Sequence, residues 1–301
     1  MPEYTLEVLP QDAGKRLDVF LMDFSHDRKL GLSRTAIQKL IAGKNVSLSS
    51  EGKVKPNYKV KPGDKFKLSI AEKIESGLLP ENLLFEVIYE DKDLAVINKP
   101  AGLVVHPAPG NPVHTLVNAL LYRFKELSNI NPTRPGIVHR LDKETSGVLV
   151  VAKNNTSHLV LAKQFSEHSI KRKYIALVEG KVEFDEGEIE IPVGRHPIKR
   201  KSMSAGFRED AKYAKTYYHT LKRSVKYSVL ELEPFTGRTH QLRVHLKFLG
   251  HPILGDSKYG RSDSFTRLAL HARYLGFIHP ASGKFVEFSS GLPKEFKVMM
   301  K

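Results

Sequence analysis

The sequence predicts an α+β protein built around a mixed, largely antiparallel β-sheet flanked by helices and loops. Strand-length apolar runs and amphipathic helical segments intermingle along the 301 residues, without the regular strand and helix alternation of a doubly wound fold. Hydrophobic residues make up 41% of the chain and charged residues 27%, so a substantial core can form. A connector containing Gly and Pro indicates two domains, expected at residues 1–72 and 83–301 and joined by a linker at 73–82.

The charge balance and the absence of cysteine narrow the choice of environment and partners. Lys and Arg number 48, Asp and Glu number 33, and the formal net charge is +15. Such an excess favours a polyanionic partner, above all a nucleic acid. No apolar run approaches the roughly 20 residues that span a bilayer, and no secretion signal opens the chain. We therefore expect a cytoplasmic protein without membrane partners, disulfides or thiolate metal sites.

The N-terminal region is predicted to contain two short helices and a small basic sheet. The first helix opens at residues 14–21, where three apolar side chains share one face. The second covers residues 32–43, with Ser33 as a candidate N-cap. Two strands and a Lys-Pro-Gly-Asp turn complete the region, at residues 46–48, 65–70 and 61–64.

The C-terminal region combines further strands and helices without an internal repeat. Expected strands lie at residues 85–89, 94–97, 148–153, 171–180, 216–218 and 227–232. Expected helices lie at residues 115–124, 157–168 and 239–250, the last with Thr239 as its N-cap and Gly250 at its end. Residues 194–201 form a basic stretch with little except Ile198 to bury, so we expect a loop that meets a phosphate backbone or water.

The densest group of reactive side chains lies at residues 138–147, directly before an apolar run of strand length. Asp142 has three basic residues close to it in the sequence, namely His139, Arg140 and Lys143. A carboxylate held ionised among cations and fixed by a rigid strand has the character of a nucleophile or a general base. The same residues also fit a surface turn whose charges are solvated and paired with one another.

A second polar segment, residues 234–250, contains the last predicted helix. Arg243 lies near the start of that helix and would clamp the central carboxylate if the two segments pack together. His240, His245 and His271 raise the alternative of a metal-dependent nuclease. A separation of five residues does not place the first two on one helical face, and no His-Glu-x-x-His motif occurs, so we expect no metal site.

The N-terminal region resembles the S4-like RNA-binding module. The resemblance rests on the helix pair, the small basic sheet, Ser33-Arg34 at the head of the second helix and Lys-Pro-Gly-Asp before the last strand. It implies that structured RNA binds a face formed by Arg34, Thr35, Gln38 and Lys39. The alternative is a lysine-rich surface that is only solvated.

Four motifs in the rest of the chain resemble the RluA/RluD family of RNA pseudouridine synthases. In the family's order they are His-Arg-Leu-Asp-Lys-Glu-Thr-Ser-Gly at 139–147, Lys-Tyr-Ile-Ala-Leu-Val at 173–178, Gly-Arg-Thr-His-Gln-Leu-Arg-Val-His at 237–245 and Leu-His-Ala at 270–272. With the N-terminal module, the resemblance covers essentially the whole chain. It implies the pseudouridine synthase type of mixed sheet and an isomerase that acts on RNA.

This resemblance implies three catalytic residues. Asp142 matches the family's catalytic aspartate. Tyr174 matches the tyrosine that stacks on the uracil and is the candidate base for the carbon-bound proton. Arg243, in preference to Arg238, matches the arginine that pairs with the aspartate.

Four further residues are expected to bind the substrate. Arg140 matches the arginine that enters the RNA stack in place of the flipped uridine. Leu270 matches the apolar wall under the base. His139 and Arg238, which belong to the same motifs, complete this group.

The implied reaction breaks the bond between ribose C1′ and uracil N1 and joins C5 to C1′. A uridine inside a helix must first leave its stack, which costs about a few kcal/mol. Because no redox step and no phosphate transfer occurs, no cofactor and no metal is implied. Attack by Asp142 on the base and attack on the sugar C1′ both fit this reaction.

The RNA substrate is expected to be structured ribosomal RNA. By family analogy, full length and the N-terminal module favour large-subunit ribosomal RNA over transfer RNA, and we expect a monomer. The alternative from another class is a non-catalytic RNA-binding or ribosome-assembly protein, since such a protein would carry the same positive charge.

Overall fold

A computed structural model describes the chain in the ranges 3–28, 30, 32, 34–49, 54–69, 78–108, 110–199 and 202–300. The candidate cap Ser33 and the first part of the expected linker, up to residue 77, lie outside these ranges. The described residues form an α+β structure with a large, mostly antiparallel sheet, so the predicted fold class is confirmed. No helix in these ranges is long and apolar enough to cross a membrane.

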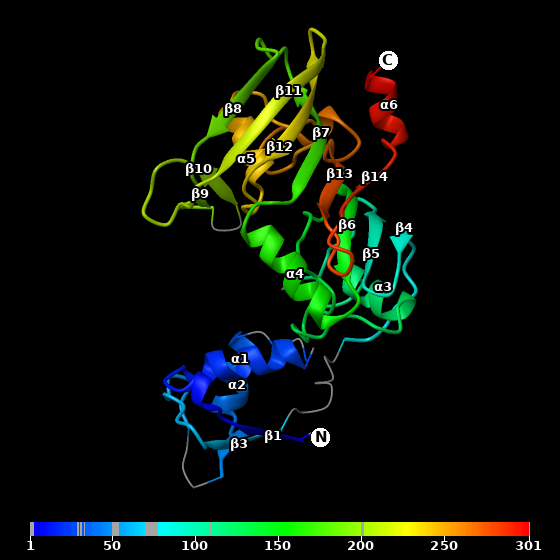
Figure 1. The fold of residues 1–301 in the computed structure, drawn as a ribbon. Coiled ribbons are helices and arrows are strands. Elements are labelled where there is room, and N and C mark those ends of the chain that lie inside the picture. The colour runs from blue at the N-terminus through cyan, green and yellow to red at the C-terminus, as the bar shows by residue number, and fades with distance from the viewer. Residues whose placement is uncertain are drawn as a thin grey trace.

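A three-stranded antiparallel sheet and two helices occupy the N-terminal region (Figure 1). The elements are β1 (Glu3–Glu7), the 3-10 turn η1 (Pro10–Asp12), α1 (Leu17–Asp27), α2 (Arg34–Ala42), β2 (Val46–Leu48) and β3 (Lys65–Ser69). In the predicted turn, the Asp64 amide donates to the Lys61 carbonyl at 3.0 Å, and Gly63 adopts φ +83°. Pro62 fits the position before such a glycine because its φ is fixed near −65°.

These N-terminal elements bury a core of their own. Leu17, Leu21, Ile37 and Phe66 are among its least exposed members. This cluster draws its residues only from the first 68 positions of the chain. The N-terminal region therefore does not depend on the large sheet for its hydrophobic centre.

The large sheet has nine strands in the order β4-β5-β6-β13-β7-β12-β11-β8, with β14 paired to β13. The strands are β4 (Glu86–Glu90), β5 (Leu94–Lys99), β6 (Ser146–Ala152), β7 (Lys171–Glu179), β8 (Glu186–Glu190), β11 (Lys215–Arg223), β12 (Tyr227–Pro234), β13 (Leu270–Ile278) and β14 (Phe285–Ser289). A separate two-stranded ribbon pairs β9 (Val193–Arg195) with β10 (Met203–Ala205). Figure 1 shows β6 and β13 side by side near the middle of the molecule.

The contact between β6 and β13 is parallel, while β13 pairs antiparallel with β7. The starts of β6 and β13 therefore lie at the same end of the sheet, and Tyr174 of β7 stands opposite Ala272. Gly147 allows β6 to lie this close to β13, because its φ is +116° and a Cβ there would lie only 2.1 Å from the Ala272 carbonyl oxygen. This junction brings the polar loop before β6 to the first residues of β13 and to Tyr174.

The described residues contain six helices, of which α1 and α2 lie in the N-terminal region, and a second 3-10 turn, η2 (Ser262–Ser264). The helices of the larger region are α3 (Leu116–Arg123), α4 (Asn155–Ser166), α5 (Gln241–Phe248) and α6 (Lys294–Met300). Thr115 and Asn118 form a reciprocal capping box at α3, which explains why that helix begins where its pattern predicts.

Two local predictions were wrong. The N-cap of α5 is His240, in the left-handed region at φ 55°, and not Thr239. No side chain caps the N-terminus of α5 in the described structure; Oε1 of Gln241 accepts instead from the Arg238 amide, at 3.0 Å, in the segment before the helix. The predicted basic loop is also partly strand, because β9 includes Gly194 and Arg195; Ile198, its one apolar side chain, is 85% exposed.

Candidate active site

A pocket of about 570 Å³ lies between the loop before β6, the start of β7 and the segment that leads into α5. Most of the residues that the sequence singles out line it: His139, Arg140, Asp142, Tyr174, Arg238, Arg243 and Leu270. The loop, the strand and the helix come from three distant parts of the chain. The sheet order described above is what gathers them.

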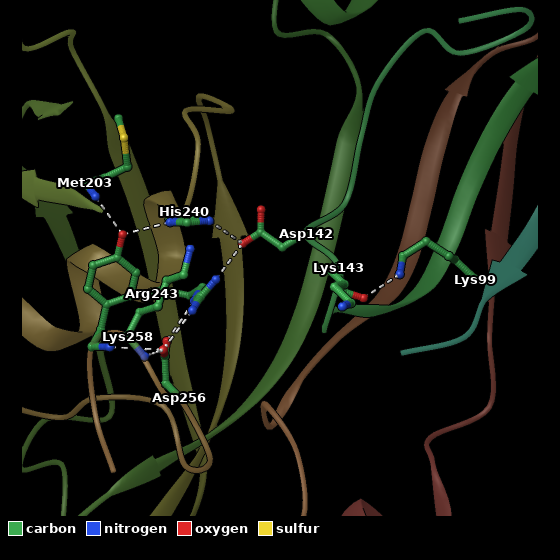
Figure 2. Close-up of polar contacts among 9 residues, drawn as sticks. Lys99, Asp142, Lys143, Met203, His240, Arg243, Asp256 and Lys258 are labelled. Carbon is green, nitrogen blue, oxygen red and sulfur yellow. Dashed lines mark hydrogen bonds and ion pairs between the residues drawn. The ribbon is translucent and has the colours of Figure 1, made fainter. Parts of the chain in front are cut away.

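Asp142 and Arg243 form an ion pair in this pocket. Nη1 of Arg243 donates to Oδ2 of Asp142 at 3.3 Å, and the two side chains are 7% and 17% exposed, Arg243 being the more buried. Figure 2 shows the guanidinium of α5 pointing at the carboxylate of the loop. The expected pairing with Arg243 is therefore present in the structure.

Arg243 is held in place by a second carboxylate that sequence analysis missed. Nε and Nη2 of Arg243 donate to the two oxygens of the fully buried Asp256, at 2.7 and 2.8 Å. Backbone amides of Lys258 and Tyr259 also donate to Asp256. Burial alone would raise the pKa of Asp256, but the Arg243 hydrogen bonds and charge outweigh it and lower that pKa. The bidentate contact leaves only Nη1 to meet Asp142.

His240 is a second neighbour of Asp142. Its Nε2 lies 3.9 Å from Oδ2 of Asp142, and burial lowers its pKa to about 4, so the ring is neutral at pH 7. The Met203 amide donates to the Tyr259 hydroxyl at 2.8 Å, and that hydroxyl lies 2.7 Å from Nδ1 of His240 (Figure 2). The hydroxyl keeps its own proton to donate to Nδ1, and in that tautomer the imidazole proton is on Nε2, facing Asp142.

A buried lysine fixes the backbone of the Asp142 loop. Lys99 at the end of β5 is fully buried, and its Nζ donates to the carbonyls of Pro100, Leu103 and Lys143 at 2.8, 2.9 and 3.0 Å. Burial lowers the pKa of Lys99 to about 7. Three carbonyl acceptors match the three N–H donors of the ammonium form. One of them belongs to the residue next to Asp142, so Lys99 determines where that carboxylate stands.

Replacing Lys99 with methionine is expected to lower the free energy of unfolding by about 3 kcal/mol, because three carbonyls lose a charged donor in a buried site. The measurement is urea unfolding followed by circular dichroism. Lys143→Met is the control, since its side chain is exposed and only its carbonyl takes part. Equal unfolding midpoints for the two variants would contradict the anchoring role of Lys99.

Tyr174 and Leu270 form the apolar part of the pocket. Tyr174 packs against two core clusters, and Leu270 at the start of β13 is 3% exposed. Burial raises the pKa of the Tyr174 phenol; the charge of Arg172 opposes this shift and that of Asp142 adds to it. The pocket thus places a neutral aromatic side chain close enough to Asp142 to sense its charge.

Residues 93–248 match the family model described as RNA pseudouridylate synthase. This chain belongs to that family. An uncharacterized RNA pseudouridine synthase of Bacillus subtilis is 41% identical over 298 residues, which cover 98% of this chain and 96% of the relative. The ribosomal large subunit pseudouridine synthase D of Zymomonas mobilis is 41% identical over 314 residues, covering 100% of this chain and 98% of the relative.

The solved structures agree with the family and the fold. Human RNA pseudouridylate synthase domain containing 1 matches with a TM-score of 0.58 and 30% identity, over 70% of this chain and 84% of the human one. The fold class and the enzyme class expected from the four motifs are both confirmed. The protein is an RNA pseudouridine synthase, an isomerase.

The basic residues close to Asp142 in the sequence of this synthase do not act as one group of cations. His139 is neutral, because burial, aided by Arg172, lowers its pKa to about 3. Its ring stacks on Phe165 at 4.4 Å, and its Nε2 accepts from the Val150 amide at 3.0 Å. The prediction of a positive charge on His139 beside Asp142 was therefore wrong. Arg140 is exposed at the pocket rim.

The other candidate residues of the synthase occupy separate places. Arg238 lines the pocket but donates from Nε to the Tyr213 carbonyl and makes no contact with Asp142 among the described residues. His245 contacts Thr216 and the Ile191 carbonyl, at 3.0 and 3.1 Å. His271 lies between two serine hydroxyls, Ser146 and Ser290, at 2.9 Å from each. The three histidines considered for a metal thus have different surroundings.

Proposed function

We propose that this synthase converts uridines of large-subunit ribosomal RNA to pseudouridine, with Asp142 as the nucleophile. The observation that carries the proposal is the Asp142–Arg243 pair at 3.3 Å in a pocket that also contains Tyr174. The substrate class follows from relatives named as large-subunit enzymes, in Zymomonas mobilis and in Nitrosomonas europaea, the latter 40% identical. Transfer RNA is the alternative substrate class.

The proposed chemistry uses each side chain of the pocket. Asp142 attacks the flipped nucleotide at the base or at C1′, and the bond between C1′ and N1 breaks. The detached uracil turns between Tyr174 and Leu270, which hold it and exclude water. C5 then joins C1′, and the bond between Asp142 and the nucleotide breaks, which restores the free carboxylate. Tyr174 is the candidate acceptor of the C5 proton, and N1 gains a proton. Arg140 at the rim fills the gap in the RNA stack.

The test of the substrate is a map of pseudouridines in the RNA of cells that lack this protein. We expect loss at specific positions of large-subunit ribosomal RNA and recovery when the wild-type gene is returned. If pseudouridines are lost only from transfer RNA, the substrate is transfer RNA and not ribosomal RNA. An unchanged map, with slower ribosome assembly, would favour the non-catalytic RNA-binding alternative.

We also propose that the region before residue 73 is an S4-like RNA-binding domain, joined by a linker at 73–82 to the catalytic domain at 83–301. Its separate core supports this division. The proposed RNA face comprises Arg34, Thr35, Gln38 and Lys39. A cytoplasmic monomer, acting on ribosomal RNA where ribosomes assemble, completes the proposal.

Two residues of that face have an internal partner. Arg34 and Gln38 donate to Oδ2 of Asp18 at 3.0 Å, and Arg16 donates to both of its oxygens. Asp18 is fully buried, and hydrogen bonds, chiefly from Arg16, hold its pKa well below the usual range. Substitution of Arg34 would thus affect folding as well as RNA binding, so Lys39, which is exposed, makes the cleaner test.

Lys39→Gln is expected to weaken binding to a large-subunit ribosomal RNA transcript and to reduce the slope of log K against log salt by about 0.7–0.9, the value of one phosphate contact. The measurement is a filter-binding titration at several salt concentrations. Lys92→Gln, in the exposed turn between β4 and β5, is the control. An unchanged slope in Lys39→Gln would remove this residue from the RNA interface.

A further inference from the structure

The pocket holds more positive charge than its carboxylate can balance. Asp142 is the one carboxylate among the described residues that line it, and that side chain already faces Arg243. Three other arginines, Arg140, Arg172 and Arg238, also line the pocket, and none of them has an acidic partner among the described residues. These positive charges favour the binding of an anion that is not part of the described protein.

Arg172 is the least satisfied of these arginines. Its Nη2 donates to the carbonyls of Pro234 and Phe235 at 3.0 and 3.1 Å, which fixes the guanidinium at the end of β12. Its Nε is buried without a partner, and Nη1 meets no acceptor in the described part of the chain. The guanidinium is therefore oriented by two carbonyls and keeps donors unused.

Gly237 leaves room at the unused end. A Cβ at this position would lie 3.1 Å from Nη1 of Arg172, closer than side chains normally approach. The φ of Gly237 is not in the left-handed region, so a side chain here would be limited by the space beside Nη1 and not by backbone conformation. Arg172 and Gly237 both line the pocket.

His168 and Arg238 also line the pocket. Burial, together with the charges of Arg172 and Arg238, lowers the pKa of His168. Its Nδ1 is buried and meets no partner among the described residues, and its ring lies 5.1 Å from that of Phe235. The charge of Arg172 lowers the pKa of the Tyr174 phenol and that of Asp142 raises it, so the phenol has both the nucleophile and Arg172 as charged neighbours. A nucleotide whose base lies on Tyr174 would extend its backbone toward one of them.

We propose that Arg172, together with Arg238, binds the backbone phosphate next to the target uridine and so positions the ribose for attack. This inference rests on the proposed function, because it takes the pocket as the site of a flipped uridine. A planar guanidinium with free donors suits a phosphodiester, whose two non-bridging oxygens share one negative charge. Arg172 is thus a positioning residue, distinct from the Asp142, Arg243 and Tyr174 set.

The test compares nucleotides with a nucleoside, because these ligands differ only by the phosphate. We expect uridine 5′-monophosphate or uridine 3′-monophosphate to bind the full chain about tenfold more tightly than uridine at low salt, the effect of one charge-assisted hydrogen bond. The ligand that shows the advantage identifies which flanking phosphate is bound. Binding is followed by NMR of the ligand with the protein in excess.

In Arg172→Met the advantage of the nucleotide should fall below about twofold, while the affinity for uridine stays unchanged. Lys181→Met is the matched control, since it removes one exposed positive charge beyond the other end of the same strand, β7. A nucleotide advantage in Arg172→Met equal to that of the wild type, or no advantage in the wild type, would overturn the proposal.

Two further variants keep the test decisive. If Arg172→Met fails to fold, Gly237→Ala replaces it, because the added methyl group presses on Nη1 and should also reduce the nucleotide advantage. An undiminished advantage in Gly237→Ala would then count against the site. Asp142→Asn should keep the full advantage, so the phosphate site is judged separately from the nucleophile and from the identity of the RNA.

Discussion

Replacing Asp142 with asparagine is expected to reduce pseudouridine formation on the order of 10⁴-fold or more, the scale seen when a catalytic nucleophile is removed. The amide has nearly the same shape but no negative charge and no lone pair basic enough to attack. Arg243 keeps both hydrogen bonds to Asp256 in this variant, so the pocket remains assembled. The loss should therefore appear in turnover and not in RNA binding.

The measurement is release of tritium from a ribosomal RNA transcript labelled at C5 of uridine, since each conversion frees the hydrogen on that carbon. Glu144→Gln is the matched control: it removes a carboxylate two residues away, and Glu144 does not line the pocket. RNA affinity is measured in parallel for both variants. Asp142→Asn activity within tenfold of the wild type would end the nucleophile role, because the amide cannot form the covalent bond.

Strands with a complete apolar pattern could be predicted from the sequence. All seven residues of β6 are buried, and β5 and β7 also contain continuous buried runs. These runs consist mostly of apolar residues, so the sequence alone shows them as strands. The edge strands β1 and β8 are different. In β1 and β8 one residue of five is fully buried, so the pattern hardly differs from that of a loop. β13 was missed because polar residues and Gly276 interrupt its apolar run.

For the active site, too, local patterns could be predicted from the sequence, but contacts between distant residues could not. Asp142 was found because its polar loop stands directly before a buried strand. Its pairing with Arg243, 101 residues away, could be expected only through the family resemblance, because spacing does not show contacts at that separation. The family resemblance gave the motif residues, but not the groups that hold them.

The missed residues act on the site through other residues. Asp256 orients Arg243, and Lys99 fixes the loop through a backbone carbonyl. A signal for Asp256 was present, since a charged residue follows Gly255 directly after the apolar pair Ile253 and Leu254. Lys99 gave a weaker signal, because a lysine at the end of a strand is usually solvated. Burial in three dimensions distinguishes it from the many exposed lysines.

Arg243→Met is expected to affect both stability and catalysis. The change leaves the fully buried Asp256 without its guanidinium, and breaking a buried pair from one side costs about 3–5 kcal/mol. It also removes the positive charge that faces Asp142, and loss of one electrostatic partner lowers turnover on the order of 10²–10³-fold. The single variant alone does not separate these two effects.

The double variant Arg243→Met with Asp256→Asn separates them. Asparagine removes the unpaired buried charge, and its carbonyl oxygen can still accept from the amides of Lys258 and Tyr259. We therefore expect the double variant to regain about 2 kcal/mol of unfolding free energy relative to Arg243→Met. Turnover should stay as low as in the single variant, because Asp142 still lacks its guanidinium.

Urea unfolding and tritium release on the same preparations give the two readings. If turnover returned together with stability, Arg243 would act only by holding the fold, and the pair with Asp142 would have no part in the reaction. If stability did not return, the unpaired Asp256 charge would not be the cause of the loss. Because Asp256 lies on the far side of the guanidinium from Asp142, the expected pattern assigns one face of Arg243 to folding and the other to chemistry (Figure 2).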